Sequence, residues 1–168
     1  MKPNFRKFAL ALHVIVAMGS LGAVASFMTL AIAGINSPDA PLVRSAYVAM
    51  AYLTPVVIVP LILAGLISGL VSSIGTSWGL FRYYWVVAKL VMTAISAAVL
   101  LLQLALIARL GRASAEGLAF GSSLHGGPIA LFFHSVVGLL VLIAVAVLSI
   151  YKPWGMTPYG LKQLRTLR

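Results

Sequence analysis

The sequence contains no cysteine and almost no acid. Only Asp39 and Glu116 carry a side-chain carboxylate among 168 residues, whereas twelve residues are Lys or Arg. Without cysteine the chain has no disulfide, no thiolate metal site and no thiol redox chemistry. With so few acids it has no carboxylate pair for catalysis, and it lacks the intramembrane Asp or Glu that proton-coupled transport normally uses. No serine has an obvious His and acid partner set, and no phosphate-binding glycine loop appears. We therefore expect a protein that is not an enzyme.

Charged residues of either sign are scarce, and most of the chain is hydrophobic. Charged residues make up 8% of the chain and hydrophobic residues 62%, with a mean hydropathy of +1.09. Soluble domains carry roughly 25% charged residues, so the composition predicts an integral membrane protein. A net charge of +10 can indicate nucleic-acid binding, but here the basic residues lie beside apolar runs. Anionic lipid headgroups are the expected partner, and nucleic acid is not.

Four apolar runs are long enough to cross a bilayer, whose core of about 30 Å needs roughly 20 helical residues. They predict an all-α, integral membrane four-helix bundle in a single domain, 1–168, with helices at about 8–35, 46–74, 83–108 and 129–151. The basic start and the Ala23-Val24-Ala25 triplet resemble a cleavable signal peptide. The apolar run continues to Ile35, so we expect a retained first helix. The Gly- and Ser-rich segment 111–128 is expected to be an exposed loop.

The basic residues divide unevenly between the two ends of the predicted bundle. One end holds nine: Lys2, Arg6, Lys7, Arg82, Lys89, Lys152, Lys162, Arg165 and Arg168. The other end holds both acids and three basic residues, Arg44, Arg109 and Arg112. Because cytoplasmic flanks are enriched in Lys and Arg, both termini are predicted to be cytoplasmic in a multi-pass protein of a bacterial inner membrane. After Lys152, Pro153 ends the fourth helix, and the tail is expected to lie at the interface.

The second predicted helix carries small residues and prolines. Gly65 and Gly69, continued by Ser73 and Ser77, recur every four residues and predict a close helix contact, either within the bundle or in a dimer. Pro55 and Pro60 are expected to kink the helix, because each removes an intrahelical hydrogen bond.

The third predicted helix carries a polar stripe. At 100° per residue, six side chains fall within an arc of about 80°: Arg82, Trp85, Lys89, Thr93, Ser96 and Gln103. The stripe should face the bundle interior, where it either forms interhelical hydrogen bonds or lines a polar pocket. Lys89 is predicted at the cytoplasmic boundary with Trp85 in cation–π reach. Together with Arg82 and Lys152, these two residues are expected to hold anionic headgroups.

Three histidines could bind a metal or a haem iron. His13 is predicted near the cytoplasmic end and His134 near the outer end, at heights that differ by on the order of 15 Å, so the two could not ligate one iron. His125 and His134 flank Gly126-Gly127-Pro128 on the same side, where a weak metal contact is conceivable. Without cysteine or a neighbouring carboxylate, no tight metal site is expected.

Three stretches carry a resemblance to known proteins: "LHVIVAMGSLGAVASF", "TSWGLFRYYWVVAKLVMT" and "LSIYKPWGMTPYG". At these stretches the chain resembles a family of small uncharacterised bacterial four-helix membrane proteins, a resemblance that implies no established activity. More remotely, the opening Leu12-His13 pair and the four-helix plan look like copper-resistance D-type and cytochrome b561-like membrane proteins. That resemblance implies a haem b or copper site that uses His13 and possibly His134.

Three hypotheses for function follow. The leading one is a structural or accessory component of a membrane complex, or a homo-oligomer, that needs no cofactor and holds anionic lipid at its cytoplasmic face. The alternative is a redox or transport protein that binds haem b or copper through His13, His134 or His125. A third is a small-solute carrier that uses the polar stripe, including Gln103.

Overall fold

The structure is a computed structural model that describes residues 3–74, 79–117, 126–153 and 155–166. Lys2, Ser77, His125 and Arg168 lie outside these ranges. All regular elements in the described ranges are helices, and they follow one another in the order α1 (Pro3–Asn36), α2 (Ala40–Leu53), a π-helical turn η1 (Thr54–Ile58), α3 (Val59–Ile74), α4 (Tyr84–Ala115), α5 (Gly127–Tyr151) and α6 (Pro158–Thr166).

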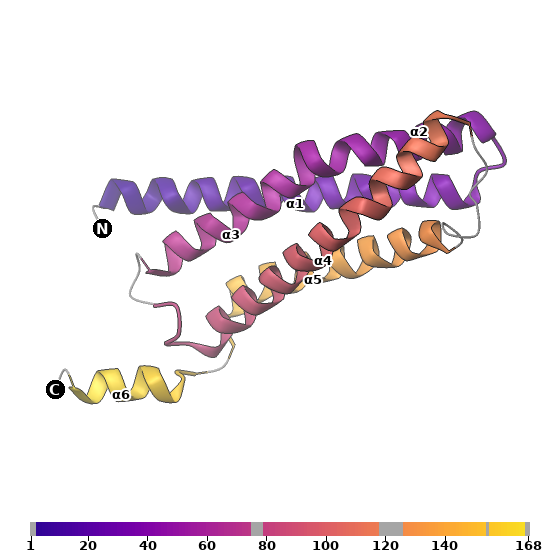
Figure 1. Ribbon diagram of the computed structural model, residues 1–168. Coiled ribbons are helices and arrows are strands. Elements are labelled where there is room, and N and C mark those ends of the chain that lie inside the picture. The colour runs from indigo at the N-terminus through magenta and orange to yellow at the C-terminus, as the bar shows by residue number, and fades with distance from the viewer. Residues whose placement is uncertain (1–2, 75–78, 118–125, 154, 167–168) are drawn as a thin grey trace.

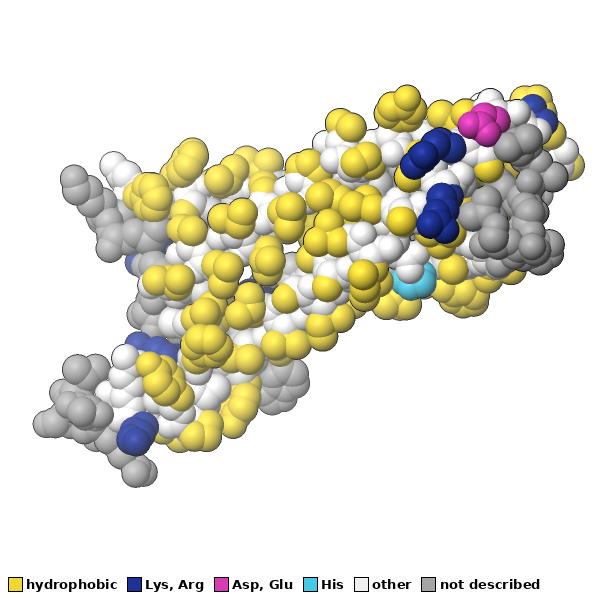
Figure 2. Space-filling model, in the orientation of Figure 1, with side chains coloured by type: hydrophobic (Ala, Val, Ile, Leu, Met, Phe, Trp, Pro, Cys, Tyr) yellow, Lys and Arg dark blue, Asp and Glu magenta, His cyan; other side chains and the backbone are white. Residues whose placement is uncertain are grey.

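Four stretches are long and apolar enough to cross a membrane, which makes this a multi-pass membrane protein of the all-helical class. The stretches are Asn4–Asn36, Ala40–Ile74, Tyr84–Ala115 and Gly127–Tyr151, and the second joins α2, η1 and α3. Successive spans run in opposite directions, so both chain ends lie at the same end of the bundle (Figure 1). Hydrophobic side chains cover the middle of the face in Figure 2, and the acidic side chain visible there lies at the opposite end from the termini.

The boundaries of two spans differ from those that the hydropathy pattern predicts. The second span begins at Ala40 rather than near 46. Pro41 lies in its first turn, where the backbone N–H that proline lacks would have no partner within the helix. The third continues to Ala115 rather than 108, so the first part of the predicted loop 111–128 is helical. Arg112 lies in the last turn of this helix, where a cation interacts favourably with the exposed carbonyl groups.

Part of the core lies where α2 packs against α1 on one side and against α4 on the other. Tyr47 and Met50 of α2 and Leu110 of α4 are fully buried there. Glycines allow the approach, because a Cβ at Gly34 would lie 2.7 Å from the Tyr47 ring, and one at Gly111 would overlap Ala51 of α2. These contacts set the spacing of the helices around the bundle interior.

The second span is interrupted at Pro55. Thr54, Pro55 and the three following residues form the π turn η1, a local break of the kind that proline and π-bulges produce in long helices. The Thr54 hydroxyl is completely buried and donates a 2.8 Å hydrogen bond to the Met50 carbonyl. Pro60 lies at the second position of α3. The irregular backbone therefore lies inside the span, where η1 packs against α1.

After α5 the chain folds back onto the turn that precedes α4. The Thr157 amide donates to the Arg82 carbonyl (2.9 Å), and the Thr157 hydroxyl donates to the Phe81 carbonyl (2.6 Å) while it accepts from the Gly160 amide (3.2 Å). Thr157 thus caps α6, whose first residue, Pro158, is favourable at that position. The tail, predicted only to lie at the interface, contains a docked helix at the end where the chain begins (Figure 1).

Candidate functional site

Lys89 lies in the second turn of α4 and points into the bundle. Its ammonium donates a 3.0 Å hydrogen bond to the Ser149 hydroxyl of α5 and lies 4.7 Å from the ring centroid of Trp85. Trp85 is itself buried, with 6% of its surface exposed. Ser149 donates in turn to the Val145 carbonyl, so its oxygen is held toward the ammonium. The charge is therefore fixed between α4 and α5 rather than directed into lipid.

His13 enters the same region from α1. Its Nδ1 lies 2.9 Å from the Ser68 hydroxyl of α3, and that hydroxyl donates to the Gly65 carbonyl (3.2 Å), so the imidazole N–H donates to Ser68. A Cβ at Gly69 would lie 3.3 Å from the His13 ring. The glycine face of the second span thus packs on α1 within the same chain, with Gly65 against Val16.

We call His13, Ser68, Trp85, Lys89 and Ser149 the basic cluster, since it joins α1, α3, α4 and α5 around one ammonium. His13 lies within electrostatic range of Lys89. The two acids of the chain lie far from it, because Asp39 precedes α2 and Glu116 follows α4 at the opposite end of the bundle. No Asp or Glu side chain therefore neutralises the charge of this cluster.

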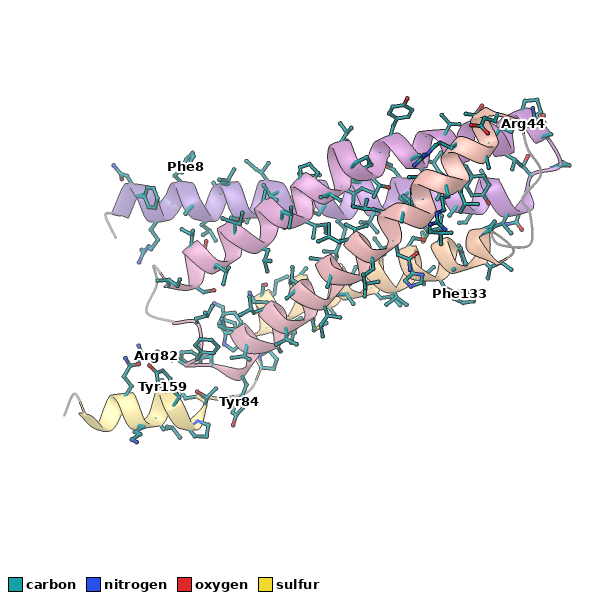
Figure 3. All side chains as sticks on the ribbon, in the orientation of Figure 1. Phe8, Arg44, Arg82, Tyr84, Phe133 and Tyr159 are labelled. Carbon is teal, nitrogen blue, oxygen red and sulfur yellow. The ribbon has the colours of Figure 1, made fainter. Side chains whose placement is uncertain are left out.

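Two more predicted headgroup ligands lie at the same end. Lys152 follows α5 in a left-handed conformation (φ 47°) and is exposed, within electrostatic range of Lys89. Arg82 lies in the turn before α4, half-buried where Gly160 of α6 approaches its backbone. Figure 3 shows Arg82 beside α6, close to Tyr159, with Tyr84 marking the start of α4. The structure thus gathers Arg82, Trp85, Lys89 and Lys152 at one end of the bundle.

A second feature, which we call the interior cavity, lies farther along the bundle. It has a volume of about 280 Å³ and is lined by residues of all four spans. Most of the lining is apolar, for example Phe27 of α1 and Ile62 of α3. Its polar lining comes from two helices and comprises Thr93, Ser96 and Gln103 of α4 with His134 and Ser135 of α5. The polar stripe therefore lines a pocket over this part of its length.

Gln103 and His134 form a hydrogen-bonded pair at the wall of the interior cavity. The His134 Nδ1 contacts the Ala130 carbonyl, which can only accept, so Nδ1 carries the proton. Its Nε2 then accepts from the Gln103 amide nitrogen at 3.2 Å. This arrangement orients the Gln103 amide and leaves it a second N–H donor.

The two described histidines belong to different levels of the bundle. His13 lies beside Lys89 and His134 beside Gln103, and these two residues of α4 are 14 positions, or about 21 Å, apart along the helix. One iron cannot bridge that distance. His125 lies outside the described residues, and among the residues that the structure describes no group of three or more His, Asp or Glu could hold a metal ion. Haem or copper binding through a single histidine stays a prediction. At His134 the metal would take the Nε2 lone pair, which accepts the hydrogen bond from Gln103.

Sequence reasoning missed the partners of these side chains. Ser68 and Ser149 hold His13 and Lys89, and Ser135 completes the polar wall of the cavity. Each lies in a largely apolar helix, where a serine hydroxyl often bonds only its own backbone, so the sequence gives no sign of the partner.

Comparisons with protein families, with curated proteins and with solved structures find no match for this chain. The resemblance to small bacterial four-helix membrane proteins therefore stays a prediction.

Proposed function

We propose that this is a non-enzymatic multi-pass membrane protein, a structural or accessory component of a membrane complex, whose basic end binds the phosphate of an anionic lipid. The observation that carries the proposal is Lys89, a cation held inside an apolar span with no Asp or Glu side chain at its end of the bundle. A charge in the membrane is costly unless it is paired, so the cluster requires an anion.

The basic cluster suits a lipid phosphate. An ammonium has three N–H donors, of which Ser149 accepts one. Trp85 covers one side of the ammonium, and Lys152 adds positive charge from the exposed side. Charge-assisted hydrogen bonds to phosphate are about twice as strong as neutral ones. A headgroup at this end would then supply the missing negative charge.

The prediction that tests this site compares two substitutions. Lys89→Gln removes the charge and is expected to lower the anionic phospholipid retained per protein about tenfold, the effect of losing one charge-assisted hydrogen bond. Arg109→Gln, an exposed change at the other end of α4, should leave retention unchanged. Native mass spectrometry of protein purified from membranes that contain phosphatidylglycerol measures both. Equal retention by Lys89→Gln and wild type would refute the lipid site.

A second prediction concerns orientation. The uneven distribution of Lys and Arg supports a cytoplasmic location of both termini in a bacterial inner membrane. The chain has no cysteine, so a single introduced cysteine is the only thiol that a maleimide can label. Gly155 and Glu116 are exposed residues at opposite ends of the bundle, and each is replaced by cysteine in turn. In intact spheroplasts a membrane-impermeant maleimide should label Glu116→Cys only, and the reverse pattern would overturn the proposed orientation.

A further inference from the structure

The interior cavity is not used by the proposed lipid site, and its size limits what it can hold. A cavity of about 150 Å³ lined by apolar side chains binds benzene. The 280 Å³ of this cavity is roughly twice that volume, which corresponds to two fused rings or to one substituted ring. A whole phospholipid is too large for this space.

The donors on the cavity wall limit the chemistry of the ligand. Gln103 has one amide N–H beyond the one that it gives to His134. Ser96 also lines the cavity, and within the described parts of the chain its hydroxyl forms no hydrogen bond. By contrast, the hydroxyls of Thr93 and Ser135 already donate to backbone carbonyls. Ser96 and Gln103 are therefore the two donors that the cavity offers.

The two residues that carry these donors are spaced along α4 in a way that suits a ring with an oxygen at each end. Ser96 and Gln103 are seven residues apart on one face of α4, or about 10.5 Å along the axis. Two carbonyl oxygens on opposite sides of a six-membered ring lie about 5 Å apart, and two hydrogen bonds of about 2.8 Å each extend the span to about 11 Å. We propose that the interior cavity binds a lipid-soluble cyclic dione, a quinone-type ring whose two oxygens accept hydrogen bonds from Ser96 and Gln103.

The ligand reaches the site from the bilayer. Ile95 of α4 and Val137 of α5 line the cavity and are also 59% and 57% exposed on the outer surface of the bundle. His134 is exposed beside them. The cavity thus adjoins the lipid-facing surface between α4 and α5, where a lipid-soluble compound is concentrated.

The test compares two probes of nearly equal shape. The wild-type protein in nanodiscs is dialysed against 2-methyl-1,4-naphthoquinone or 2-methylnaphthalene, and nanodiscs without protein correct for partition into lipid. The dione should bind saturably with one site per chain and at least about tenfold tighter than the hydrocarbon, the effect of one or more net hydrogen bonds. Because the chain has no cysteine, thiol addition to the quinone cannot mimic binding. Equal affinities would show a site for any hydrocarbon, acyl chains included, and would overturn the proposal, as would the absence of saturable binding.

Two variants locate the site. Gln103→Leu should weaken dione binding about tenfold and leave hydrocarbon binding unchanged, because it removes a donor but keeps the volume. Ser96→Phe should abolish the binding of both probes by filling the cavity. Ser26→Phe is the matched control on α1, since Ser26 is exposed, does not line the cavity and bonds only the Gly22 carbonyl. If Ser26→Phe lost binding as Ser96→Phe does, or if Ser96→Phe bound the dione normally, the site would not be this cavity. The comparison of the two probes on wild-type protein decides the proposal even if a variant fails to fold.

Discussion

Replacing Gly111 by Leu is expected to lower the free energy of unfolding by about 3 kcal/mol, the upper part of the usual range for overpacked cores. At this position α4 lies directly on α2. A Cβ on residue 111 would overlap the Cβ of Ala51 and would lie 3.3 Å from the Tyr47 carbonyl oxygen. Neither neighbour can rotate away, because one is a methyl group on the main chain and the other is main chain itself. The two helices must separate to admit the leucine.

Gly22→Leu is the matched control for this substitution. Gly22 also lies inside a span, but a Cβ there would meet no atom within 4 Å and would face lipid. Unfolding in mixed micelles with increasing SDS should show a much lower midpoint for Gly111→Leu and a midpoint at or above wild type for Gly22→Leu. Equal midpoints for the two variants would contradict the close contact between α2 and α4.

Gly111 also illustrates which parts of the fold the sequence alone predicts. The number and order of the spans follow from hydropathy, because about 20 apolar residues suffice to cross the bilayer core. The ends of the spans do not. Arg109, Gly111 and Arg112 lower the local hydropathy, so the sequence predicts that the helix ends before them. In the structure Arg109 and Arg112 are exposed at the end of α4 while Gly111 is buried against α2. Long basic side chains reach the interface without ending the helix.

The candidate sites could be predicted on one helix but not across helices. The period of 3.6 residues places Thr93, Ser96 and Gln103 on one face of α4, and all three line the interior cavity. Their partners depend on how α5 is rotated against α4. That rotation brings His134 to Gln103, which lies 31 positions earlier in the chain. It also brings Ser149 to Lys89, which lies 60 positions earlier. Such long-range packing leaves no local pattern in either helix.

Replacing Gly160 by Leu is expected to detach α6 while the four spans stay folded. A Cβ at Gly160 would lie 2.6 Å from the Arg82 carbonyl oxygen and 3.2 Å from the Arg82 Cα. Because both atoms belong to the main chain, the helix must move away. That movement breaks the hydrogen bonds that Thr157 donates to the carbonyls of Phe81 and Arg82. The described contacts of α6 are with this turn rather than with the interior of the bundle, so the opening is local.

Limited proteolysis separates local opening from global unfolding. Trypsin should cleave after Lys162, an exposed residue of α6, about tenfold faster in Gly160→Leu than in wild type, since cleavage follows the population of the open form. The midpoint of SDS unfolding should not change. Gly155→Leu is the control, because a Cβ there would meet nothing within 4 Å although the residue lies in the same tail. Equal cleavage of the two variants would show that α6 does not dock. A fall in the unfolding midpoint of Gly160→Leu would show instead that the turn beneath α6 supports the whole bundle, and with it the position of Lys89.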